Sequence, residues 1–141
     1  MNTTKILDKA AKGYTMLSLL SLLYVSLLAM IAPQKIMDMV HINLGNTDAI
    51  SSIRGVYGGV GLSICFSLVY LLFQKPNWAL GFLVVFWGCY AISRVMTILM
   101  EGLLGNFGSQ WLLIEAILFL LGAGLLTSIG LQKKQAILSG S

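Results

Sequence analysis

Charged residues are scarce in this chain. Of its 141 residues only 10% are Asp, Glu, Lys or Arg, whereas 57% are apolar. An ordinary soluble domain is about half apolar and about a quarter charged. So few charges cannot cover a water-facing surface of normal composition, and the composition therefore argues against a soluble globular domain.

Residues that form the common catalytic and metal sites are also few. His41 is the only histidine, and Asp38, three residues before it, is alone insufficient, so no metal site is predicted. The patterns H-E-x-x-H, G-x-S-x-G and G-x-x-x-x-G-K-[ST] do not occur. The two cysteines, Cys65 and Cys89, lie inside apolar segments and are interpreted as core thiols. No bound cofactor is expected.

The chain has four long apolar segments instead, each near the roughly 20 residues that cross a bilayer core. They predict an all-α integral membrane protein with one domain of four transmembrane helices over residues 1–138, and residues 139–141 are interpreted as a tail or cloning scar. The predicted spans cover about residues 14–33, 50–73, 78–100 and 110–131.

The connections predict how the helices are arranged. Residues 74–77 and 101–110 are short, so the second and third spans, and the third and fourth, should be antiparallel neighbours. In the longest connection, Ile36, Met37 and Val40 are spaced to share one helical face. The sequence thus predicts an antiparallel four-helix bundle of two helical hairpins, with a short interfacial helix between the first and second spans.

The lysines predict the orientation. Most of them precede the first span, separate the second from the third, or follow the fourth: Lys5, Lys9, Lys12, Lys75, Lys133 and Lys134. Because lysine concentrates on the cytoplasmic side, both termini should be cytoplasmic and the loops 34–49 and 101–110 outside. The net charge of +4 is therefore a topology signal, and no nucleic-acid partner is expected because the lysines form no stripe with interleaved aromatics.

Three charged residues of the spans, Arg54, Arg94 and Glu115, fall toward the outer face. Counting along the helices puts Arg94 roughly 9 Å and Glu115 roughly 6 Å inside the outer ends of their spans. Charges at such depth pair, face the bundle interior or line a wet cavity. Either Arg94 and Glu115 form an interhelical ion pair with Arg54 at the interface, or the excess positive charge holds an anionic ligand or lipid head group.

A glycine-rich stretch begins at Arg54. Arg54, Tyr57, Gly58 and Gly61 are spaced to share one helical face. Gly55 and Gly59 form a G-x-x-x-G step, which is typical of tight helix packing in lipid. The candidate ligand-binding residues are Arg54, Tyr57, Arg94, Glu115 and Tyr90, one turn from Arg94; the candidate packing residues are Gly55, Gly58, Gly59 and Gly61.

Five features together carry a family resemblance: a first span ending in Ala32-Pro33, an amphipathic outer connection, the R-x-x-Y-G-G element at Arg54, Arg94 late in the third span and Glu115 early in the fourth. The layout resembles a bacterial family of small four-helix membrane proteins catalogued as domain of unknown function 4345, over nearly the whole chain. The resemblance implies a bacterial cytoplasmic (inner) membrane. That family looks related to the DoxX and DoxD type proteins, which implies a periplasmic-side site near a quinone.

The sequence favours a non-enzymatic accessory protein with an outer-leaflet pocket for an anionic or amphiphilic small molecule or a lipid, in which the arginines bind and Glu115 orients them. One alternative is a quinone or lipid oxidoreductase or isomerase with Glu115 as proton donor or acceptor. Another is a structural interaction subunit that docks through its glycine faces. The expected partners are the lipid bilayer, the small molecule or quinone, and a second copy or a larger membrane complex.

Overall fold

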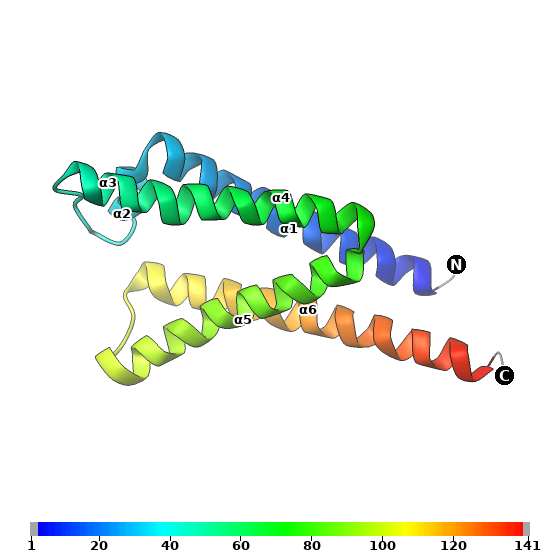
Figure 1. Cartoon of the computed structure of the whole chain (residues 1–141). Helices are drawn as coiled ribbons and strands as arrows, with labels where there is room; N and C mark the ends of the chain where they lie inside the picture. The colour runs from blue at the N-terminus through cyan, green and yellow to red at the C-terminus, as the bar shows by residue number, and fades with distance from the viewer. Residues whose placement is uncertain (1–2, 140–141) are drawn as a thin grey trace.

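The computed structural model of the protein describes residues 3–139. This range contains helices and short connections and no strand, which confirms the predicted all-α class. Residues 140 and 141, most of the predicted tail, lie outside the described residues. The elements in chain order are α1 (Thr3–Ile31), α2 (Pro33–Asp38), α3 (Thr47–Ile53), the π-helix η1 (Arg54–Gly59), α4 (Val60–Gln74), α5 (Pro76–Glu101) and α6 (Asn106–Ser139) (Figure 1).

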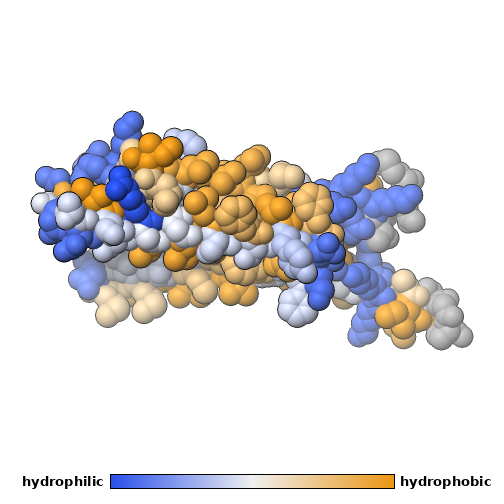
Figure 2. Space-filling model, turned by 45° about the horizontal axis from the view of Figure 1, so that its top comes forward, coloured by the Kyte–Doolittle hydropathy of each residue, from blue (hydrophilic) through white to orange (hydrophobic). Residues whose placement is uncertain are grey.

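Four helical stretches are long and apolar enough to cross a membrane, judged by length and composition. They are α1, the continuous run of α3, η1 and α4, then α5, and α6. Figure 2 shows apolar side chains over the middle of the molecule and hydrophilic ones gathered at its two ends. One end carries both termini and is called the terminal end; the other carries α2, α3 and the α5–α6 connection and is called the loop end (Figure 1).

Proline and asparagine set the helix boundaries. Pro33 and Pro76 each stand at the first position of a helix, where a missing N–H is tolerated. The residues before them, Ala32 and Lys75, leave the helical conformation at φ −138° and −146° because proline disfavours it there. Asn46 caps α3 by accepting from the Ala49 amide at 2.8 Å. α1 begins at Thr3, before its predicted span, and α6 runs past its predicted span to Ser139, since hydropathy marks a bilayer boundary and not the end of a helix.

The predicted interfacial helix is present and shorter than expected. In α2, Ile36 and Met37 are buried, whereas Val40 lies beyond its end and is 42% exposed. The Gln34 side chain explains the early end, because its amide donates to Asp38 and to the Ile42 carbonyl at 2.7 and 3.0 Å. These bonds favour a compact loop over another helical turn.

The long helices pack as two pairs. α5 and α6 make the most extensive contact, and α1 packs along η1 and α4. Although a single residue, Lys75, joins α4 to α5, these two helices contact each other less and diverge toward the loop end (Figure 1). The predicted contact between the second and third long helices is therefore closest near the turn that joins them.

Two separate hydrophobic clusters follow from this arrangement. Near the terminal end all four long helices share one core, which includes Tyr14, Leu68, Leu83 and Ile129. Nearer the loop end a smaller cluster around Ala29 is built from α1, α2 and α3 with no residue of α5 or α6. The two helix pairs are thus joined by a common core at one end only.

Candidate functional site

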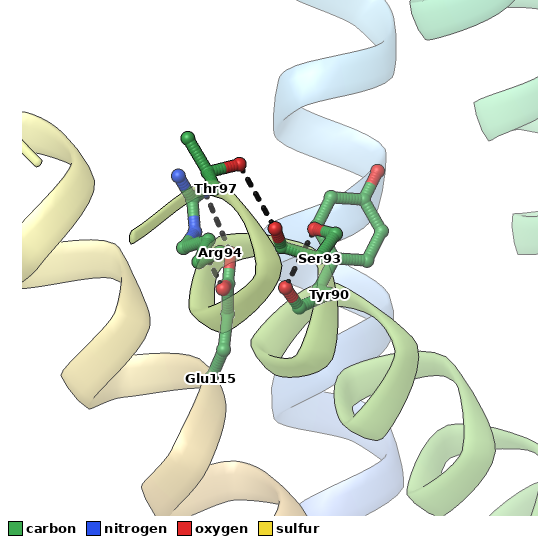
Figure 3. Close-up of polar contacts among 5 residues, drawn as sticks. All are labelled: Tyr90, Ser93, Arg94, Thr97 and Glu115. Carbon is green, nitrogen blue, oxygen red and sulfur yellow. Dashed lines mark hydrogen bonds and ion pairs between the residues drawn. The ribbon is translucent and has the colours of Figure 1, made fainter. Parts of the chain in front are cut away.

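Arg94 of α5 and Glu115 of α6 form a bidentate ion pair (Figure 3). Arg94 donates from Nε to Glu115 Oε2 at 2.6 Å and from Nη2 to Oε1 at 2.8 Å. Two parallel N–H···O bonds between a guanidinium and a carboxylate fix orientation as well as distance. Arg94 lies about two turns from the end of α5, so the pair is well inside the apolar part of the molecule.

Neighbouring hydroxyl groups on α5 do not compete for this pair. Ser93 donates to the Tyr90 carbonyl at 2.8 Å, and Thr97 donates to the Ser93 carbonyl at 2.9 Å (Figure 3). Both hydroxyls are thus bonded to their own helix, as Ser and Thr commonly are in apolar helices. The polar character of this region therefore comes from Arg94 and Glu115.

The pair lies in the wall of a cavity of about 570 Å³, which has α1 and α2 on one side and α5 and α6 on the other. Small-molecule sites commonly have volumes of about 300–1,000 Å³. α1, α2, α5 and α6 all contribute to the lining: Leu20, Ser21, Leu22, Tyr24, Val25, Leu28, Ile36, Met39, Phe86, Trp87, Tyr90, Arg94, Phe107, Trp111 and Glu115. Apart from the ion pair this lining is mostly aliphatic and aromatic.

The position of the cavity follows from the division of the hydrophobic core into two clusters. It lies where the α1–α2 group and the α5–α6 pair no longer share a core. Leu20 and Tyr24 line it and are also 57% and 66% exposed, so they form part of its rim. The cavity therefore opens among apolar side chains on the flank of the molecule.

Aromatic rings make up much of the wall. Phe86 and Trp87 pack edge to face with their centroids 5.1 Å apart, and Phe86 lies 5.0 Å from Tyr90. On α6, Phe107 and Trp111 lie 6.1 Å apart. The Trp87 indole donates to Ser18 of α1 at 3.3 Å, which anchors this part of the wall to the neighbouring helix.

Arg94 and Glu115 differ in how they face the cavity. The Glu115 side chain is 2% exposed and the Arg94 side chain 22%. Both carboxylate oxygens accept from Arg94, and these bonds occupy two of the five N–H donors of a guanidinium. Within residues 3–139 the other three have no described partner. Arg94, a lining residue and the more exposed partner, therefore brings N–H donors to the cavity, whereas the carboxylate of Glu115 is almost completely buried.

Two of the predicted site residues, Arg54 and Tyr57, are not among the residues that line this cavity. Arg54 instead donates from Nε to the carbonyl oxygen of Met30 at the end of α1, at 3.1 Å. Tyr57, in η1, is 38% exposed. The structure thus places Arg94, Glu115 and Tyr90 in the cavity lining and Arg54 and Tyr57 outside that lining. The physical reason is that the broken end of α1 offers Arg54 an unpaired carbonyl.

The predicted packing glycines also divide into two kinds. A Cβ placed at Gly58 would lie 2.5 Å from the Met30 sulfur, and one at Gly61 would collide with Ser26. Gly55 has nothing within 4 Å, and Gly59 meets only the Arg54 carbonyl at 3.9 Å. Close approach to α1 therefore depends on Gly58 and Gly61, and the G-x-x-x-G step makes no tight contact inside the described chain.

Of the aromatic wall, Tyr90 was among the predicted site residues, and a sequence signal exists for further members. Tyr90 and Phe86 stand four and eight residues before Arg94, and Trp111 and Phe107 stand four and eight before Glu115. Residues at such spacing lie on one helical face. Counting back from the two charges would have found these four residues, whereas nothing in the sequence marks the α1 side of the cavity.

The histidine and the two cysteines are not among the residues that line this cavity. His41 lies in the loop after α2 with φ 58° and is exposed. Cys65 is buried and Cys89 exposed, and both are free thiols. Among the described residues no group of three or more His, Cys, Asp or Glu could hold a metal ion.

Comparison with known proteins gives one match. The family model described as "Domain of unknown function (DUF4345)" matches residues 10–126, a range that includes every residue lining the cavity. No curated protein and no solved structure matches the chain.

Proposed function

The chain belongs to the family described as "Domain of unknown function (DUF4345)", and we propose that it is a bacterial inner-membrane protein that binds an amphiphilic small molecule or lipid in the cavity beside Arg94 and Glu115. In this proposal the four long helices span the bilayer as two antiparallel hairpins. Both termini are cytoplasmic, and the loops 34–49 and 101–110 are outside. The molecule enters from the lipid and is held as cargo or as a structural ligand.

Membrane insertion is supported by the distribution of apolar side chains. Residues such as Phe66, Phe73 and Leu99 are 74%, 77% and 79% exposed on the long helices. Surfaces of this kind, covering the middle of the molecule between hydrophilic ends (Figure 2), are unfavourable in water and favourable in lipid. The lysines in the first turns of α1, at the α4–α5 turn and near the end of α6 support the orientation.

The observation that carries the binding proposal is a buried ion pair in the wall of an otherwise apolar cavity that opens among apolar side chains. An amphiphile has the matching composition, because its tail can fill the aliphatic and aromatic part and its head can reach Arg94. Intramembrane ionisable residues commonly mark functional sites. Binding sites are likewise concave and mostly apolar, with few polar groups that fix orientation.

The same geometry favours binding over catalysis. The Glu115 side chain is 2% exposed and both of its oxygens accept hydrogen bonds from Arg94, so a substrate reaches the carboxylate only if the pair first moves. A binding role uses the pair as it stands. The enzymatic alternative therefore requires a rearrangement that the binding proposal does not.

A cavity-blocking variant with a matched control tests the proposal. Ser21 and Ser67 are both exposed serines that donate to a carbonyl four residues earlier, at 3.0 and 2.9 Å, but only Ser21 lines the cavity. Native mass spectrometry would compare the wild type with Ser21→Trp and Ser67→Trp after incubation with a total lipid extract. We expect a retained amphiphile in the wild type and in Ser67→Trp and its loss in Ser21→Trp. Equal retention in all three proteins, or none in the wild type, would refute the proposal.

A further inference from the structure

The charges that line the cavity cancel. Arg94 and Glu115 are its only ionised side chains, and they bind each other. Arg54, which the sequence analysis added to the positive side, bonds to the end of α1 and does not line the cavity. The excess of positive charge expected at this depth is therefore absent from the cavity wall.

The unequal exposure of Arg94 and Glu115 nevertheless favours one kind of ligand head group. The Glu115 side chain is 2% exposed and both of its oxygens already accept from Arg94, whereas the Arg94 side chain is 22% exposed, so the accessible polar atoms of the pair are N–H donors. A head group that only donates hydrogen bonds finds no accessible charged acceptor in this wall, and the remaining side-chain acceptors are the hydroxyl oxygens of Ser21, Tyr24 and Tyr90. A head group with acceptor oxygens can bind the remaining N–H groups of Arg94 without displacing Glu115.

Net charge then decides between neutral and anionic acceptors. An anionic head would add one uncompensated negative charge to a neutral pair inside an apolar layer, where charge is strongly disfavoured. An ester, ketone or hydroxyl oxygen takes the same hydrogen bonds and leaves the site neutral. Hydrogen bonding thus favours an acceptor, and charge balance favours an uncharged one.

Building on the proposed function, we infer that the ligand is an uncharged amphiphile whose head group accepts hydrogen bonds from Arg94 through carbonyl, ester or hydroxyl oxygens. The head lies against Arg94, and the apolar part occupies the space between α1 and the aromatic residues of α5 and α6. Anionic lipids such as phosphate monoesters are disfavoured by their charge.

Two lipids that differ by a single phosphate group test this inference. Monoolein and oleoyl lysophosphatidic acid share the acyl chain and the glycerol, and only the second carries a phosphate. With dibrominated acyl chains, both quench tryptophan fluorescence on contact, and Trp87 and Trp111 line the cavity whereas Trp78 does not. In uncharged detergent we expect the monoglyceride to quench at a concentration lower by about tenfold or more, which corresponds to a modest charge penalty.

The control is the double variant Trp87→Phe/Trp111→Phe, in which Trp78 is the only tryptophan left. Its quenching reports lipid contact outside the cavity. Tighter binding of the phosphate lipid would overturn the inference and leave the proposed function intact. Failure of both lipids to quench the wild type beyond this reference would count against the proposed function itself. The two ideas therefore fail by different outcomes.

Changing the net charge of the cavity wall should change which of the two lipids binds more tightly. Glu115→Gln leaves Arg94 unpaired, so the site becomes positive and the phosphate lipid should bind more tightly than the monoglyceride. Arg94→Gln/Glu115→Gln restores neutrality and should again favour the monoglyceride. An unchanged preference in a folded Glu115→Gln protein would show that charge does not select the ligand; if that variant does not fold, the wild-type comparison still decides.

Discussion

Arg54 ties η1 to the end of α1 by donating from Nε to the carbonyl oxygen of Met30 at 3.1 Å. The last carbonyls of a helix have no N–H partner in the same helix, and α1 ends at Ile31 because Pro33 follows. A cation at a helix C-terminus also interacts favourably with the helix dipole. Gly58 allows the close approach, since a Cβ there would meet Met30. The R-x-x-Y-G-G element therefore stabilises the junction of α1 and η1.

Replacing Arg54 should affect stability and not binding. Arg54→Met removes one charge-assisted bond at a helix end and should lower the free energy of unfolding by about 1 kcal/mol. Thermal unfolding in detergent, followed by circular dichroism, measures this change. Retention of the amphiphile should be the same as in the wild type, and a loss of retention at unchanged stability would return Arg54 to the binding site.

Two glycines of the same stretch should respond oppositely to alanine. A Cβ at Gly61 collides with Ser26 of α1, so Gly61→Ala should destabilise by about 1–3 kcal/mol through overpacking. Gly55 has open space around it, and Gly55→Ala should be neutral or stabilising by up to about 1 kcal/mol, because alanine favours the helix. Comparison of the two unfolding midpoints checks this. Destabilisation by Gly55→Ala instead would reveal a contact outside the chain.

The effects of replacing Arg94 and Glu115 on the free energy of unfolding should be strongly coupled. Arg94→Met or Glu115→Met leaves one buried charge without its partner, and each should destabilise by about 3–5 kcal/mol. The double variant Arg94→Met/Glu115→Met removes both charges, so it should lose much less than the sum of the two. A double-mutant cycle of unfolding free energies measures the coupling. Additive losses would mean that the two side chains do not depend on each other.

Labelling from the two sides of the membrane tests the orientation. After replacement of Cys65 and Cys89, Asn43→Cys in the loop after α2 should react with a membrane-impermeant maleimide added to spheroplasts. Gln74→Cys at the α4–α5 turn should react only after the membrane is permeabilised, because the lysines place that turn in the cytoplasm. The reverse pattern would invert the topology.

Several features could be predicted from single residues and their neighbours. Pro33 and Pro76 mark helix starts because proline constrains its own backbone and the residue before it. Asn46, which caps α3, belongs to a residue type that is strongly preferred at helix N-caps. The pairing of Arg94 with Glu115 was one of two stated interpretations, and it followed from similar depth on helices joined by a short loop.

Other features could not be predicted this way. The partner of Arg54 is a backbone carbonyl, and every residue supplies one, so the sequence does not single out Met30. The choice of Gly58 and Gly61 over Gly55 and Gly59 depends on which side of η1 faces α1. That direction is set by packing, and the π-helical turn of η1 shifts it from the face counted on a regular helix.

The sequence by itself determined that four long apolar helices exist, where proline and asparagine end or begin them, and that two opposite charges lie at similar depth within them. These properties depend on local backbone chemistry and on hydropathy. Only the tertiary structure decided that the helix groups share a core at one end and separate at the other, which places the ion pair in a cavity wall and Arg54 outside it. The reason is that helix packing depends on contacts between distant segments, which no local pattern encodes.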